Sequence, residues 1–229
     1  MSPEFLPFSL AGVELVAAAS GALWWPEARV LAVADLHLEK GASFAARGAM
    51  LPPYDTADTL ARLNTAIQRW KPEVVVALGD SFHDRGSVGR ACDGTIEALT
   101  AAVRSVPDWI WICGNHDPSP EGPWGGQVAE SLAIGPLLFR HQAETQASPG
   151  EVSGHFHPKA RVSFGPRSVS GGCFLHDGEK LILPAFGAFT GGLDIGDPAI
   201  KELFPSGFQV FLAARGKILP VSASAARRR

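Results

Sequence analysis

The stretch "VLAVADLHLEKG" (residues 30–41) begins as an apolar run and ends in polar residues. Its apolar part is typical of a buried strand and predicts one over about residues 29–35. Asp35, His37 and Glu39 then alternate along the chain, so an extended backbone would place them on one face. Because an unpaired carboxylate or imidazole is costly to bury, these side chains need a partner that stabilises them.

Two further apolar segments follow this first strand, and helix-like spacing lies between them. In the first predicted helix, Asp55 is a plausible cap and Pro72 lies beyond the end. The alternation of strand and helix predicts a parallel sheet with right-handed crossovers. The predicted elements are a helix over 55–70, a strand over 74–78, a helix over 94–105 and a strand over 109–113.

The character of the chain changes after Pro118, where proline and glycine become frequent. We expect an antiparallel half here that shares one core with the parallel half, in a single domain over 1–220. The basic end of the chain, 221–229, is expected to be a disordered tail. The strands expected in this half cover 136–140, 151–155, 161–164, 168–175 and 180–183, followed by a hairpin within 207–221.

Composition places the chain among proteins with a substantial core. It has 229 residues, of which 46% are hydrophobic and 19% charged, with a formal net charge of −3. That charge neither favours nor excludes a nucleic-acid partner. Three cysteines without a CxxC spacing suit a reducing compartment. With no secretory pattern and no long apolar run, the chain is expected to be cytoplasmic and to have no membrane partner.

Polar residues follow each of the three predicted parallel strands, where ligands bind in open α/β sheets. The second half adds further histidines, so that six of the seven in the chain lie in these motifs and only His176 lies outside. His155 and His157 are two apart, which on a strand would place them on one face. The motifs are DLH (35–37), GDSFHD (79–84), GNHD (114–117), His141 and GHFH (154–157).

Each motif alone has an ordinary explanation as a turn, a helix cap or a local hydrogen bond. Three apolar strands that all end in buried polar groups are better explained by a shared bound partner. The candidate ligands offer carboxylate, amide and imidazole groups and no thiolate. This donor set favours a divalent cation such as Mn²⁺ or Fe²⁺, with Zn²⁺ as an alternative.

The order DxH, GDxx(H/D), GNHD, H, GHxH resembles that of the binuclear metallophosphoesterase, or calcineurin-like, superfamily. More narrowly, "DLHLEKG", "GDSFHD", "GHFHPKARV" and "LPAFGAFTGG" resemble the ligase-associated DNA damage response endonuclease family, from about Val30 to Gly192. The resemblance implies an α/β fold, a sandwich of two packed mixed β-sheets flanked by helices. It also implies two divalent metal ions, of which Mn²⁺ is favoured.

The resemblance also implies which residues hold these ions. Asp80 would bridge the two cations, and a water that they activate would attack phosphorus in line. By this correspondence the first metal takes Asp35, His37, Asp80 and His157, and the second takes Asp80, Asn115, His141 and His155.

Two histidines have no place in either ligand set. His116 follows the asparagine ligand directly, and we expect it to act as general acid or transition-state donor. His83 stands where many phosphatases of the superfamily have Asp or Asn, and it resembles a nuclease branch in which it contacts the scissile phosphate. The ordinary alternative for His83 is a hydrogen bond to Asp84. Glu39 has no superfamily role and is expected either behind the ligands or in solvent.

The function expected from the resemblance is a two-metal phosphodiesterase, namely a DNA endonuclease in DNA repair that favours single-stranded DNA. Its family functions beside a DNA ligase, a helicase and an exonuclease. A phosphatase or small-molecule phosphodiesterase on the same scaffold is the alternative, and a non-catalytic binding module is a minor one. Six flanking cations either contact phosphates or are solvated: Lys40, Arg47, Arg85, Arg90, Lys159 and Arg161.

Overall fold

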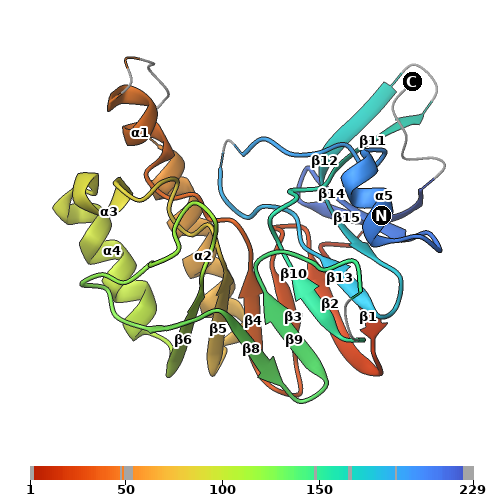
Figure 1. Ribbon diagram of the computed structural model, residues 1–229, viewed down its shortest axis with the longest axis horizontal. Helices are drawn as coiled ribbons and strands as arrows, with labels where there is room; N and C mark the ends of the chain where they lie inside the picture. Colours follow the sequence, from red (N-terminus) through yellow and green to blue (C-terminus); the bar gives the residue numbers. More distant parts are fainter. Residues whose placement is uncertain are drawn as a thin grey trace.

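The computed structural model describes residues 3–46, 48, 54–146, 149–164, 167–188 and 190–223. Two mixed β-sheets pack against each other, and helices cover their outer faces (Figure 1). Two predictions concern residues outside this description, namely the phosphate contact by Arg47 and most of the disordered basic tail over 221–229. The described chain continues as a strand to Ser222, two residues past the predicted end of the domain.

The first sheet has the order β1-β2-β3-β4-β5-β6-β7. Strands β1 to β4 pair in an antiparallel manner, and β4 to β7 pair in parallel, as the strand–helix alternation predicts. The strands are β1 (Phe5–Leu10), β2 (Val13–Ala18), β3 (Leu23–Trp25), β4 (Val30–Val33), β5 (Val74–Leu78), β6 (Asp108–Ile112) and β7 (Gln127–Ala129).

The second sheet has the order β15-β14-β12-β13-β10-β9-β8, with β11 paired to β12. The expectation of an antiparallel half was wrong for β10, which pairs in parallel with β9 and β13. The strands are β8 (Ser131–Ile134), β9 (Leu137–Arg140), β10 (Glu151–Ser153), β11 (Lys159–Phe164), β12 (Arg167–His176), β13 (Lys180–Ile182), β14 (Gln209–Ala214) and β15 (Lys217–Ser222).

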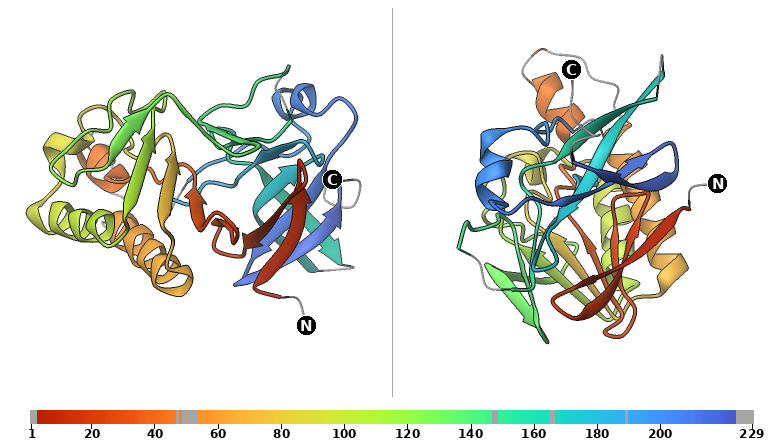
Figure 2. Two further views of the ribbon diagram at one scale, coloured as in Figure 1. Left: turned by 90° about the horizontal axis from the view of Figure 1, so that it is seen from below. Right: turned by 90° about the vertical axis from the view of Figure 1, so that its right-hand side faces the viewer.

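The helices cover the outer faces of the two sheets. Figure 2 shows α2 and α4 on one side of the first sheet and the β11–β12 ribbon at the other end of the molecule. Of the elements predicted in the first half, both helices and all three strands are confirmed to within a few residues. The helices are α1 (Lys40–Ala46), α2 (Asp55–Trp70), α3 (Ser87–Arg90), α4 (Asp93–Arg104) and α5 (Pro198–Leu203).

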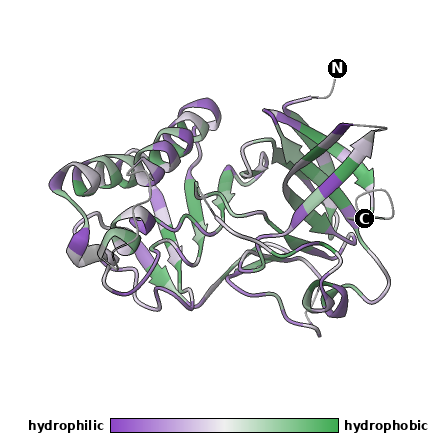
Figure 3. Ribbon diagram, turned by 90° about the horizontal axis from the view of Figure 1, so that it is seen from above, coloured by the Kyte–Doolittle hydropathy of each residue, from purple (hydrophilic) through white to green (hydrophobic). Residues whose placement is uncertain are grey.

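Apolar residues form three clusters, one between the two sheets and one on the outer face of each sheet. The central cluster joins the inner faces of the two sheets, and β4 and β5 supply residues to it and to the cluster beneath α2 and α4. The third cluster lies between α5 and the outer face of the second sheet. Hydropathy follows this layering in Figure 3, where the strands are mainly hydrophobic and the long helices carry both kinds of residue. The ends of the central strands are therefore held by core on two sides.

The prediction that Asp55 caps α2 was wrong. The N-cap is Tyr54, without a side-chain cap hydrogen bond, and Asp55 lies buried in the first turn. Its carboxylate accepts a hydrogen bond from the backbone N–H of Gly41 at 3.0 Å. This contact joins α2 to α1, directly after the polar end of the first motif. Among the described residues, no helix is long and apolar enough to span a membrane.

Candidate metal centre

The candidate ligands lie in loops at the carboxyl ends of β4, β5, β6, β9 and β10. Five of them have left-handed backbone conformations that residues other than glycine rarely adopt. Such conformations cost about 1–3 kcal/mol each and gather at functional sites, where the surrounding structure enforces them. The φ angles are 53° at Asp35, 44° at His37, 45° at Asp80, 70° at His155 and 45° at His157.

Backbone hydrogen bonds between loops enforce these conformations. The N–H of His37 donates to Asp80 O at 2.9 Å, so the loops after β4 and β5 run side by side. From the loop that follows β13, the N–H of Gly187 donates to Asp35 O at 3.0 Å. Gly187 must be glycine, because a Cβ there would lie 2.2 Å from Leu36 O. The DLH motif therefore lies where the loops of the two sheets meet. We call this region, which contains the seven candidate ligands, the seam.

Asp35, His37 and His157 form a first cluster whose ligand atoms all lie within 4.8 Å of one another. His157 Nε2 is 3.3 Å from Asp35 Oδ1 and 3.2 Å from His37 Nε2. Asp35 is fully buried, and its carboxylate also accepts from the backbone N–H of His155 at 3.0 Å. Asp35 and His37 thus lie beside His157, the histidine predicted to share their metal ion, which comes more than a hundred residues later in the chain.

Asp80, His141 and His155 form a second cluster with the same spacing. His141 Nε2 lies 3.5 Å from Asp80 Oδ2. The other nitrogen, Nδ1, lies 2.9 Å from Leu78 O, an orientation that leaves Nε2 facing the cluster. Asn115 Oδ1 is 2.9 Å from both His141 Nε2 and His155 Nδ1. The structure therefore brings all seven predicted ligands into two adjoining groups.

The electrostatics of the two clusters show how strongly the groups interact. Burial opposes ionisation of Asp80, but contacts with His141 and the His116 N–H lower its pKa to about 2. Burial disfavours the charged form of His141, but Asp80 and Asp35 raise its pKa to about 9. Burial and the neighbouring His157 lower the pKa of His37 to about 3. Buried carboxylates thus hold positive charge here, as they would hold a cation.

The donor set fits two divalent cations. Within the described chain, both clusters contain carboxylate oxygens and imidazole nitrogens, and neither contains a cysteine. Nitrogen atoms of two imidazoles approach to 3.2 Å in the first cluster, between His37 and His157, and to 3.1 Å in the second, between His141 and His155. Imidazole nitrogens this close to one another and to a carboxylate can share one cation, and N/O donors suit Mn²⁺, Fe²⁺ or Zn²⁺.

The two histidines outside the ligand sets stand beside the first cluster. The rings of His83 and His116 stack at a centroid distance of 5.9 Å, and both lie within 5.7 Å of the His37 ring. His116 donates its backbone N–H to Asp80 Oδ1 at 2.9 Å, while its side chain is 45% exposed. Its ring can therefore meet a bound substrate.

Asp117, the last residue of GNHD, has a role that the sequence did not reveal. Its buried carboxylate accepts from the backbone N–H of Phe82 at 2.9 Å, directly beneath the Asp80 loop. Burial raises its pKa to about 7. Gly114 must be glycine, because a Cβ would lie 2.2 Å from Asp80 N and 2.5 Å from Asp117 Oδ1. Asp117 thus supports the loop that carries Asp80.

One expectation about side-chain placement is corrected, and one open alternative is decided. His155 and His157 do not share a strand face, because β10 ends at Ser153 and both residues lie in a left-handed loop. The loop instead directs one histidine to each cluster. Of the two alternatives left open for Glu39, the solvent-exposed one is excluded, because the residue is buried and accepts a hydrogen bond from Thr95 Oγ1 at 3.2 Å. It lies outside both clusters.

The family match and one of two similar solved structures, a Pseudomonas putida nuclease, support this interpretation of the site. Residues 28–155 match the family of calcineurin-like phosphoesterases. The crystal structure of a Pseudomonas putida nuclease, MPE, is similar with a TM-score of 0.72 and 27% sequence identity, covering 95% of this chain and 100% of that one. YfcE, a phosphoesterase from E. coli, covers 86% of this chain and 99% of its own with a TM-score of 0.41 and 12% identity. No curated protein matches.

A mixed two-sheet sandwich with two Asp/His clusters at the strand ends defines a metal-dependent phosphoesterase. The chain belongs to the calcineurin-like phosphoesterase family, whose match spans the motifs from DLH to the first histidine of GHFH. It is therefore a hydrolase that uses two divalent metal ions.

Proposed function

We propose that this protein is an endonuclease that cuts DNA, with single-stranded DNA favoured, and that it acts in DNA repair. The observation that carries the proposal is the similarity to a Pseudomonas putida nuclease over 95% of this chain at 27% identity. His83 adds support, because a histidine at its place resembles the nuclease branch of the superfamily and its ring lies 5.7 Å from that of the proposed ligand His37.

The proposed ligands divide between the two clusters. Asp35, His37 and His157 would hold one ion, and Asn115, His141 and His155 would hold the other, with Asp80 between them. When bound, the two cations would supply Lewis-acid activation of water and of the phosphoryl oxygens. Mn²⁺ is the proposed native ion, because the donor set combines carboxylates and imidazoles without thiolate.

The protein's own groups would orient the ligands and move protons. Leu78 O fixes the tautomer of His141, and the His116 N–H fixes one oxygen of Asp80. The exposed His116 ring, with Nε2 3.9 Å from Asp80 Oδ2, would donate a proton to the leaving oxygen. His83 would donate a hydrogen bond to a non-bridging oxygen of the scissile phosphate.

The cellular setting is also a proposal. The family resemblance suggests a cytoplasmic protein that acts beside a DNA ligase, a helicase and an exonuclease, from a single domain over about 1–220. All nine proposed site residues come from this chain.

Product analysis on defined substrates tests the proposal. The Mn²⁺-loaded protein would be incubated with circular single-stranded DNA, duplex DNA and p-nitrophenyl esters. We expect internal cuts in the circular single strand, which has no ends for an exonuclease, and slower cuts in duplex. Hydrolysis of the esters with every DNA left intact would reject the DNA assignment and favour the small-molecule alternative.

A further inference from the structure

Two adjoining cavities lie beside the first ligand cluster. The inner one, of about 340 Å³, is lined by His157 and by Lys159, Gly172 and Thr190. The outer one, of about 390 Å³, is lined by Lys159 and Gly172 again and by Arg161 and Ser170. Because they share two residues, they form one groove that begins at a candidate metal ligand and leads away from it. We name it the Lys159–Arg161 groove.

The β11–β12 ribbon sets the positions of the two cations. Burial alternates along β11, so Lys159 and Arg161 are exposed while Ala160 between them is buried. Residues two apart on a strand share one face at a spacing of about 6.6 Å. On β12, Gly172 lies opposite Lys159 and Ser170 lies opposite Arg161. Small residues thus face both cations and leave the groove open.

The position of Lys159 is set by a specific contact. Its Nζ donates to Thr190 O at 2.7 Å, where the inner cavity meets the outer one. A carbonyl uses one of the three ammonium donors and leaves the charge in place. The backbone of the same residue also bonds to the loop that forms the opposite wall, through Leu193 O at 2.8 Å. These two contacts place the ammonium group of Lys159 at the junction of the two cavities.

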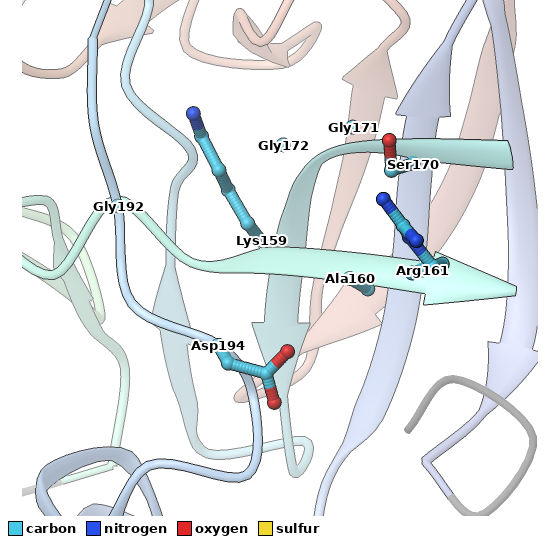
Figure 4. A pocket seen from close by; sticks show the side chains of 8 residues that line it. All are labelled: Lys159, Ala160, Arg161, Ser170, Gly171, Gly172, Gly192 and Asp194. Atoms are coloured by element: carbon cyan, nitrogen blue, oxygen red, sulfur yellow. The ribbon is translucent and has the colours of Figure 1, made fainter. Parts of the chain in front are cut away.

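The groove is cationic despite one acidic residue in its lining. Asp194 lines the outer cavity, so the charges of Lys159, Arg161 and Asp194 leave one positive charge in excess. Figure 4 shows the side chains of Lys159 and Arg161 pointing the same way, while the Asp194 carboxylate points toward neither. Asp194 Oδ1 accepts instead from Gly196 N–H at 2.9 Å. The acidic group thus stabilises its own loop.

We propose that the Lys159–Arg161 groove binds the phosphodiester backbone of a nucleic-acid strand on one side of the scissile phosphate. This inference rests on the proposed function and deepens it, because it names the part of the protein that distinguishes a polymer from a small ester. A small ester would contact only the metal centre and would not reach the groove. A strand places further phosphates along the groove, where contacts with the backbone hold the polymer in register without reading its sequence.

Equilibrium binding tests the groove separately from catalysis. The full chain in EDTA would be titrated into fluorescent oligothymidylates, a dodecamer and a dimer, at several salt concentrations. For the double variant Lys159→Ala/Arg161→Ala, we expect dodecamer binding to weaken by at least about 10-fold, with a salt slope smaller by about 1.4, or 0.7 for each lost phosphate contact. The loss for the dimer should be much smaller.

A matched double variant controls for overall charge. Arg104→Ala/Lys217→Ala removes two exposed cations at the end of α4 and the start of β15, and it should bind as the wild type does. Equal affinities and equal salt slopes for the groove variant and the wild type would overturn the groove. An equal loss in the control variant would also overturn it, because the effect would then be net charge alone.

Cleavage after Mn²⁺ loading separates the two proposals. If the wild type binds the dodecamer through the groove but cuts no DNA, the proposed endonuclease activity fails while the groove stands. If the wild type cuts DNA and the groove variant keeps the wild-type preference for long over short substrates, the groove fails while the activity stands. With both proposals correct, the groove variant should lose about 10-fold or more of its rate on the dodecamer relative to bis-p-nitrophenyl phosphate.

Discussion

Two regions of this molecule bury histidine in opposite ways. At the seam between the sheets, His37, His141 and their neighbours lie against carboxylates, an amide oxygen and one another. At the end of β12, His176 is 4% exposed and packs against Phe8 and Phe211, with ring centroids 5.0 and 4.7 Å away. Neither of its ring nitrogens has a hydrogen-bond partner within the described part of the chain.

The backbone differs between the two regions as well. His176 ends a regular strand and pairs with Leu181 and Gln209, while five of the seven candidate ligands at the seam have left-handed backbone conformations. Burial alone therefore says little about whether a histidine binds a ligand. What distinguishes the seam is that strained loops direct several donors to one point, and such strain persists only where other contacts enforce it.

The largest effect should come from Asp80, which we place between the two cations. Asp80→Ala should bind neither metal tightly. Its rate of hydrolysis of bis-p-nitrophenyl phosphate should fall by at least about 10⁴-fold, because the two cations act as one catalytic unit and both depend on this carboxylate. Metal analysis after Mn²⁺ loading and a rate measurement check both expectations. Asp108→Ala, which removes an exposed carboxylate at the opposite end of β6, serves as control. An Asp80 variant that hydrolyses normally would exclude this residue as a bridge.

Much of this seam could be predicted from the sequence, because its donors follow apolar strands at recognisable spacings. Asp35, His37 and Asp80 all come directly after strands that periodicity identifies. The sequence motifs alone did not divide these donors between two clusters, and that division was implied by the family resemblance. The region around His176 could be predicted less well, since nothing in its local sequence shows that Phe8 and Phe211 lie beside it.

The errors share one physical cause, which is contact between distant segments. Asp55 suits an N-cap locally, but Gly41 N–H competes for its carboxylate in the folded chain. Alternation would place His155 and His157 on one face, but the left-handed backbone at both residues turns them apart. Asp117 was overlooked because its importance depends on Phe82 N–H, from another loop. Local propensity describes none of these contacts.

His116 should show the second largest effect, because we assign it to proton transfer and not to metal binding. His116→Ala should keep both metals and lose about 10²–10⁴ in rate on a diester with a poor leaving group. The loss should shrink for a p-nitrophenyl ester, whose leaving group barely needs a proton. Parallel kinetics on the two substrates check this, and equal losses would show that His116 stabilises the transition state without acting as an acid.

His83 should show a smaller effect that depends on the substrate. If it donates to the scissile phosphate, His83→Ala should bind two metals, melt normally and cut single-stranded DNA about 10²–10³ more slowly. His83→Asp places a carboxylate beside an anionic diester and should do at least as much harm. Cleavage assays with metal analysis check both variants. A His83→Asp protein that nicks DNA at the wild-type rate would remove the support that this residue gives to the nuclease proposal.

The smallest effect belongs to His176, and it concerns stability instead of catalysis. Burial lowers the pKa of His176 below its ordinary value, partly opposed by Asp177. The unfolded chain, with a histidine pKa of about 6.5, therefore binds a proton more readily than the folded chain. Protonation should favour unfolding as the pH falls below about 6.5, and it should contribute nothing well above that pH.

His176→Phe removes this proton-binding group and two buried nitrogens without partners in the described chain, while keeping an aromatic ring among Phe8 and Phe211. We expect the variant to be more stable by about 1–3 kcal/mol at about pH 5 and to gain less at about pH 8. For a chain of this size that is about 2–4 °C in Tm for each kcal/mol.

Melting in EDTA at both pH values, compared with the wild type, isolates the effect from the metal-site histidines, which both proteins retain. A gain in Tm that is the same at both pH values would mean that packing, and not protonation, explains it, and a lower Tm at both would show that His176 has a polar partner that stabilises it.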